Sequence, residues 1–211
     1  MKSNPALIRV QGHGSVSSVP DTIVLGLDLN SEHEEYDRVI ADASRRLELL
    51  TQAIAKTGLS PELLRTESFN VGVERDYDAG HYIFRAYSVK HSLSLRIPFD
   101  QAQLGDVFAA VTRSKARANL SLSFTVSDPE GVKSRVLEAA VKNARSRAEI
   151  IASAAGLKLG GIQGIEYGHT VITVSSPPLM FSEACASPAM DINPADIESD
   201  DTVLVVWELC G

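Results

Sequence analysis

The sequence has only two cysteines, Cys185 and Cys210, among its 211 residues. Two cysteines are too few for a disulfide framework, so we expect two free thiols. The sequence also lacks any apolar run near the roughly 20 residues that cross a bilayer. Its first residues, MKSNPALIRV, contain no apolar core of a signal peptide. As written, the sequence predicts a cytoplasmic protein without a membrane-spanning segment; a periplasmic or cell-surface location is expected if a leader has been removed.

Basic residues are missing from the C-terminal quarter of the chain. The last one is Lys158, and eight acidic residues follow it without a compensating base. Residues 1–158 are close to neutral, so this quarter carries the whole formal net charge of −7. An acidic protein lacks the electrostatic attraction on which nucleic-acid binding depends. No nucleic-acid partner is therefore expected.

Motifs for catalysis, cofactors and metals are also missing. No two of the five histidines have the spacing of a zinc site. Gly12-His13-Gly14 has no third glycine and opens no helix, so we interpret it as a twist or bulge in an early strand. Asp76, Asp78 and Gly80 resemble the start of a calcium loop, but Tyr87 occupies the glutamate position, which favours a polar hairpin tip. We expect no catalytic residue, cofactor or metal, and no enzyme.

The longest helical pattern lies between Asp128 and Gly160. Asp128 suits the N-cap, Pro129 the first turn and Gly156 a left-handed C-cap. Apolar residues recur on one face at steps of three and four, and most are alanine: Val132, Val136, Ala140, Ala144, Ala148, Ile151, Ala152 and Ala155. Small side chains let a helix backbone approach its neighbour closely. We interpret this helix as a structural spine packed on a sheet or a second helix.

Two further helices and several strands are expected around this spine. Apolar periodicity predicts helices at 34–56 and 100–112, and strands at 7–10, 23–29, 64–73, 82–97, 120–126, 162–167, 170–174 and 202–209. Hairpins mixed with strand–helix–strand units favour an α+β fold, in which the long alanine-rich helix and two further helices pack on antiparallel or mixed sheets. The chain is expected to be a single unit of residues 1–211, or two intertwined α/β subdomains of about 1–98 and 99–211.

Four stretches together resemble the SIMPL-domain family, a family of unknown function. They are GHG followed by VPD at 12–21, the hairpin TESFNVGVERDYDAGHYIFRAYSVKHSLSLRI, the helix LEAAVKNARSRAEIIASAAGLKLGGI, and the last strand at 203–209. The resemblance covers nearly the whole chain in the family's order. It implies an α+β fold, sometimes assembled into large hollow oligomers, with no agreed catalytic residues. Many relatives are periplasmic or lie at the cell surface.

The segment 175–201 is expected to be a long irregular loop. Loops of this length without regular structure are usually functional or disordered, and this one holds large apolar side chains that need a surface to cover. We expect its apolar residues to dock on a basic surface of a neighbouring copy around Arg113 and Arg117. The predicted contact residues of the loop are Leu179, Met180, Phe181, Met190 and Ile192. The alternative is that the loop folds back over its own sheet.

The sequence thus favours a non-catalytic structural or interaction protein that self-assembles into a homo-oligomer. The alternative is a module that binds a small ligand or a partner protein, which requires a pocket between helix and sheet. A hydrolase is the weaker alternative, because acids and histidines cluster in no short window.

Overall fold

In the computed structural model, which describes residues 6–78, 80–168, 171–181 and 192–211, the chain forms two compact units. Residues 1–20, 126–175 and 195–211 make the terminal unit, and residues 21–125 and 176–194 make the central unit. Each unit is assembled from segments that are distant in the sequence. The expected boundary near residue 98 lies inside the central unit.

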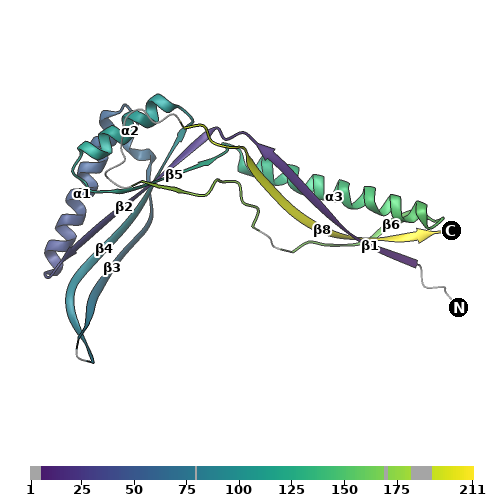
Figure 1. Cartoon of the computed structure of the whole chain (residues 1–211), viewed down its shortest axis with the longest axis horizontal. Coiled ribbons are helices and arrows are strands. Elements are labelled where there is room, and N and C mark those ends of the chain that lie inside the picture. The colour runs from purple at the N-terminus through teal and green to yellow at the C-terminus, as the bar shows by residue number, and fades with distance from the viewer. Residues whose placement is uncertain (1–5, 79, 169–170, 182–191) are drawn as a thin grey trace. The chain divides into compact units, whose positions relative to one another are not determined.

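The terminal unit is a three-stranded antiparallel sheet covered by one long helix (Figure 1). Its elements are β1 (Ala6–Ser18), α3 (Pro129–Ala154), β6 (Lys158–Glu166) and β8 (Ile197–Cys210). The strand order is β1-β8-β6, so the apolar last strand is central, as its composition predicts. The core beneath α3 contains Val10, Val203, Val205 and Trp207.

Helix α3 begins and ends where the sequence indicates. The Asp128 carboxylate caps it by accepting a hydrogen bond of 2.9 Å from the Gly131 N–H, and Gly156 has a φ of 73°. Six residues of the predicted stripe are buried, and they lie four apart: Val132, Val136, Ala140, Ala144, Ala148 and Ala152. The prediction is wrong for Ile151, which is 50% exposed, and for Ala155. A stripe this narrow excludes Ile151, because neighbouring helix residues point about 100° apart.

The Gly12-His13-Gly14 segment is not a bulge, and that part of the prediction is wrong. Strand β1 pairs with β8 without a register break from Ala6 to Ser18. The glycines are needed because α3 lies directly above them. A Cβ added at Gly12 would lie 2.6 Å from the Ala144 Cβ, and one added at Gly14 would lie 2.6 Å from the Ala140 N. The small residues of strand and helix thus meet, and the two backbones pack in close contact.

The central unit is a five-stranded antiparallel sheet of order β3-β4-β2-β5-β7 with two helices on one face (Figure 1). Its strands are β2 (Thr22–His33), β3 (Leu64–Asp78), β4 (His81–Pro98), β5 (Asn119–Thr125) and β7 (Leu179–Phe181). Its helices are α1 (Tyr36–Lys56), the 3-10 turn η1 (Pro61–Leu63) and α2 (Gln101–Arg113).

The core of the central unit follows from the alternation in β2. Ile23, Leu25, Leu27 and Leu29 are almost completely buried and face the apolar sides of α1 and α2. Asp100 caps α2, since its carboxylate accepts from the N–H groups of Ala102 and Gln103 at 2.8 and 3.1 Å. The α+β prediction, with antiparallel sheets and three helices, is confirmed for the described residues.

Two predictions for the later part of the chain need correction. The predicted strand at 170–174 is absent from residues 171–174, although Ile172 and Val174 are buried against α3. The segment 175–201 is not irregular throughout, because Leu179–Phe181 form β7 and β8 already begins at Ile197. No helix in the described part of the chain is both long and apolar enough to cross a membrane.

Candidate functional site

The described residues of the predicted docking loop pack on their own unit. Strand β7 pairs with β5, with Phe181 opposite Leu120. The Phe181 ring contacts the Phe108 ring at a centroid distance of 5.3 Å. Ile192 is buried in the same core, and its carbonyl accepts a hydrogen bond of 2.9 Å from Gln101 Nε2. For Phe181 and Ile192 the structure therefore has the alternative arrangement, in which the loop covers its own sheet.

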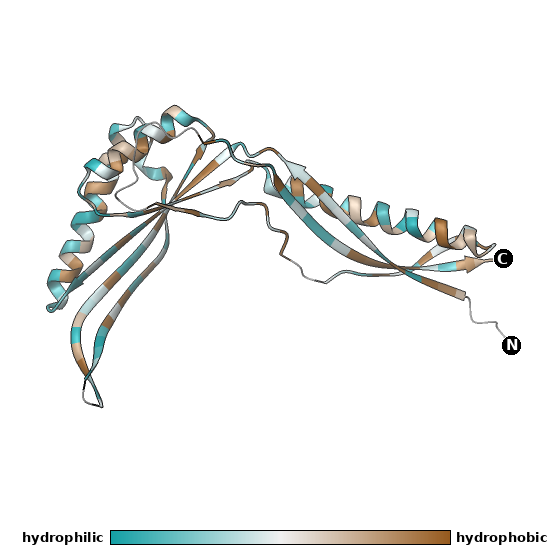
Figure 2. Ribbon diagram, in the orientation of Figure 1, coloured by the Kyte–Doolittle hydropathy of each residue, from teal (hydrophilic) through white to brown (hydrophobic). Residues whose placement is uncertain are grey.

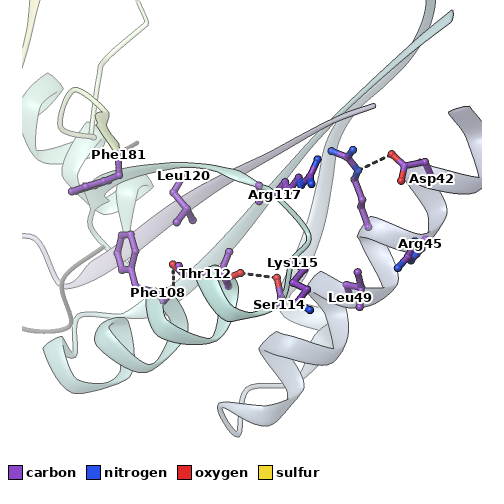
Figure 3. Close-up of a pocket in the computed structure, with 13 residues that line it drawn as sticks. Asp42, Arg45, Leu49, Phe108, Thr112, Ser114, Lys115, Arg117, Leu120 and Phe181 are labelled. Atoms are coloured by element: carbon purple, nitrogen blue, oxygen red, sulfur yellow. Dashed lines mark hydrogen bonds and ion pairs between the residues drawn. The ribbon is translucent and has the colours of Figure 1, made fainter. Parts of the chain in front are cut away.

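The other predicted contact residues are distributed as follows. Leu179 and Met180 are 49% and 72% exposed, and Met190 lies outside the described residues. Arg113 is exposed at the end of α2, and Arg117 is exposed in the turn before β5. Arg117 and Phe181 line the same pocket (Figure 3), so Arg117 and the loop meet within one chain.

A more extensive exposed surface lies on the β3–β4 hairpin, which we call the apolar hairpin face. Directly opposite residues of an antiparallel pair share a face, and the register sets Phe69, Val71 and Val73 opposite His91, Val89 and Tyr87. Beyond them the same face continues through the Arg75–Phe84 and Tyr77–Tyr82 pairs. Its large exposed apolar residues are Phe69, Val71, Val73, Tyr77, Tyr82 and Phe84, each 42–74% exposed.

The apolar hairpin face continues the covered side of the sheet. Val89 is buried against Val39 and Ala43 of α1, whereas the β3 residues are exposed outside that cluster. The alternation between hydrophobic and hydrophilic residues can be followed along both strands in Figure 2. β3 also lies at the end of the strand order, so no described strand pairs with its outer edge.

Charged residues of the hairpin gather in an ion-pair network centred on Arg85, the extra residue of a bulge in β4. The Arg85 guanidinium lies 2.9 Å from Glu32, 3.3 Å from Asp76 and 4.0 Å from Glu74. Hydrogen bonding to Glu32 and the charge of Glu32 raise the pKa of Arg85. Exposed pairs of this kind add little stability individually. On β3, positions 69, 71, 73, 75 and 77 belong to the apolar hairpin face, and Arg75 is the one charged residue among them.

The sequence predicts this hairpin but does not show that one of its faces is apolar and exposed. Alternation of Phe69, Val71 and Val73 was the available signal, and it predicts a strand with one covered face. Only the strand order shows that β3 is an edge strand beyond the reach of α1.

Two titratable residues have distinctive surroundings. His91 is 6% exposed, its Nε2 lies 3.0 Å from Thr66 Oγ1, and burial lowers its pKa. The Tyr167 hydroxyl donates a hydrogen bond of 2.8 Å to the buried Asp201, and this bond raises the Tyr167 pKa. Within the described residues, no three metal-ligating side chains come together in a potential metal site.

Comparison with known proteins places the chain in a family. Residues 8–207 match the SIMPL family, described as a protein of unknown function (DUF541). The chain is 26% identical over 212 residues to the uncharacterized protein YggE of Escherichia coli K12, covering 96% of this chain and 82% of that protein. It is 24% identical over 184 residues to the 26 kDa periplasmic immunogenic protein of Brucella melitensis, covering 85% of this chain and 71% of that protein. The resemblance seen in the sequence is confirmed, and the chain belongs to the SIMPL family.

Proposed function

We propose that this protein is a non-catalytic interaction protein that self-assembles into a homo-oligomer through the apolar hairpin face and the outer edge of β3. The observation that supports the proposal is the set of six large apolar side chains exposed on one face of the hairpin. Contiguous exposed apolar surface on a folded protein commonly marks an interaction site.

The edge of β3 adds a directional contact to this apolar surface. The strand has 15 residues, and an edge strand presents a row of N–H and C=O groups that another strand can pair with. Natural monomers protect such edges with short strands, charges or coverage. A second copy of the chain supplies an identical edge, and two identical edges can pair around a two-fold axis.

Charge limits which surface two copies of this chain can use for contact. Copies with a net charge of −7 repel each other, so their contact requires a surface that carries few acidic groups. The apolar hairpin face meets this requirement, because Glu74 and Asp76 alternate with its β3 residues and therefore lie on the other face of the strand. This surface replaces the loop residues as the proposed contact, because Phe181 and Ile192 pack on their own unit.

The test is the native mass of the full chain measured by light scattering. We expect an oligomer for the wild type and a smaller species for Val71→Glu and Val73→Glu, because each places an acid in an apolar contact. Val171→Glu makes the same change at a residue of the terminal unit that is 81% exposed, and it should keep the wild-type mass. Circular dichroism checks that all variants are folded.

A monomeric wild type would contradict self-assembly and favour a different protein partner. An oligomer that Val71→Glu and Val73→Glu leave intact would place the contact elsewhere.

We also propose a periplasmic location, in place of the cytoplasmic one that the sequence as written predicts. The support is the Brucella melitensis relative, whose name describes it as periplasmic. Fractionation of cells that express the natural gene checks this: recovery in the cytoplasmic fraction would contradict it.

A further inference from the structure

The central unit contains a pocket of about 670 Å³ between α1, α2, β5 and β7. Its size lies within the range of small-molecule sites, roughly 300–1,000 Å³. α1 contributes Arg45 and Arg46, the turn before β5 contributes Lys115 and Arg117, and β7 contributes Phe181 (Figure 3).

The pocket concentrates positive charge in a protein that is acidic as a whole. Four of its lining residues are basic and one, Asp42, is acidic, which gives a formal local charge of +3. Arg46 is already engaged, because its Nε lies 2.7 Å from the Asp42 carboxylate and its guanidinium donates to the Asn30 carbonyl at 2.7 Å. Asp42 in turn accepts a hydrogen bond of 2.9 Å from Ser31.

The remaining three cations, Arg45, Lys115 and Arg117, are exposed at the pocket and form no ion pair within the described part of the chain. They come from two different elements, so their convergence is a product of the fold. Three unpaired cations around one cavity attract an anion.

The backbone holds two of these cations in an unfavourable conformation. Lys115 and Arg117 have φ values of 61° and 54°, and they are the non-glycine residues with positive φ in the described chain. This conformation is sterically unfavourable for a residue with a side chain. Ala116 between them is fully buried, and the Ser114 hydroxyl donates to the Val111 carbonyl and accepts from the Ala116 N–H. The anchored turn therefore projects both basic side chains outward.

The other end of the pocket is apolar. The Phe108 and Phe181 rings are in edge contact at 5.3 Å, and Leu120 lies beside Phe181 through the β5–β7 pairing. In Figure 3 these apolar side chains occupy one end, and the basic side chains of Lys115, Arg117 and Arg45 occupy the other. The pocket thus has a cationic end and an apolar end.

We propose that this pocket binds a small amphiphilic anion, whose carboxylate pairs with Arg45, Lys115 and Arg117 and whose hydrocarbon body packs on Phe108, Leu120 and Phe181. Both ends contribute, since charge-assisted hydrogen bonds orient the head and burial of the body supplies hydrophobic free energy. The site is separate from the apolar hairpin face, so it exists whether or not the chain assembles.

The experiment is titration of the full chain by calorimetry with three probes. Decanoate carries head and tail, decanol carries the same tail without the charge, and inorganic phosphate carries charge without a tail. We expect decanoate to bind at least about tenfold more tightly than either of the others, since a hydrogen bond to a charged group contributes about 1.5–3 kcal/mol.

The variant Lys115→Gly/Arg117→Gly removes two cations and relieves the positive-φ strain, because glycine adopts this conformation freely. It should remain folded and bind decanoate at least about tenfold more weakly. Arg65→Gln/Arg96→Gln removes the same charge from exposed positions on β3 and β4, and it should bind like the wild type.

Several outcomes overturn the proposal. The first is that decanoate does not bind at concentrations below those at which it forms micelles. The second is that decanol or phosphate binds as tightly as decanoate. The third is that the double glycine variant binds decanoate as tightly as the wild type does.

Discussion

His91 shows how a single buried residue links this fold to pH. The side chain lies on the helix-covered side of the central sheet, near Thr66 Oγ1 and in edge contact with the Phe69 ring at 5.1 Å. Burial lowers its pKa from the usual 6.5, because a charged imidazolium is poorly solvated there. In the folded protein His91 thus stays neutral at pH values where the unfolded chain already binds a proton.

The stability contributed by this neutral histidine is present above the unfolded-state pKa of about 6.5. It is lost as the pH falls from there through the lower folded-state pKa, because the unfolded state binds more protons in that window. We expect the free energy of unfolding to fall between pH 7 and pH 5 more steeply in the wild type than in His91→Gln, whose side chain does not titrate. Urea titrations at several pH values measure this. Parallel curves for the two proteins would show that His91 does not couple folding to pH.

At the scale of elements, the terminal unit depends on the close approach of α3 and β1. Gly12 and Gly14 lie under the alanine stripe, and a Cβ at either position would meet backbone atoms of α3. Backbone cannot rotate away as a flexible side chain can. The helix and the strand must therefore separate if either glycine gains a side chain.

Gly12→Ala should lower the free energy of unfolding by about 1–3 kcal/mol, the usual cost of overpacking. Ala144→Leu approaches the same contact from the helix and should have a similar cost. Gly161→Ala is the matched control, because a Cβ there would meet nothing within 4 Å, and it should stay within about 0.5 kcal/mol of the wild type. Midpoints of urea unfolding compare the three variants. Equal midpoints for Gly12→Ala and Gly161→Ala would contradict the close approach.

The same elements show how far sequence reasoning reaches. Asp128 and Gly156 mark the ends of α3 correctly, because helix caps act on residues a few positions away. The sequence does not show why residue 12 is a glycine, because the atoms that require one belong to Ala140 and Ala144, which only the fold brings near. The sequence also does not show that the loop around Phe181 packs on its own unit, for a related reason. Its short pairing with Leu120 is non-local, and a three-residue strand has no periodicity to detect.

The candidate sites were predictable only in part. Arg117 and Phe181 were both singled out from the sequence, but their common pocket also requires Arg45 on α1, which no sequence pattern connects to them. The apolar hairpin face follows from the edge position of β3, and strand order is a property of the whole sheet.

At the scale of the whole molecule, one chain passes repeatedly between two units, and each unit has hydrophobic clusters of its own. The core around Leu25 draws only on residues of the central unit, from Ile23 to Ile192. The core around Val205 draws only on residues of the terminal unit, from Val10 to Trp207. Among the described residues, the members of each of these two clusters all belong to one unit.

Separate cores predict separate responses to core substitutions, because proteins open locally in cooperative units that follow their packed cores. Leu25 and Val205 are both fully buried, and truncating a buried Leu to Ala costs about 2–5 kcal/mol. Leu25→Ala should speed amide hydrogen exchange mainly in β2, β4 and β5, while Val205→Ala should do so mainly in β1, β6 and β8. Exchange followed by mass spectrometry of peptides resolves the two sets of strands within one chain. If either substitution speeds exchange equally in both sets, the two cores unfold together and the molecule behaves as a single cooperative unit.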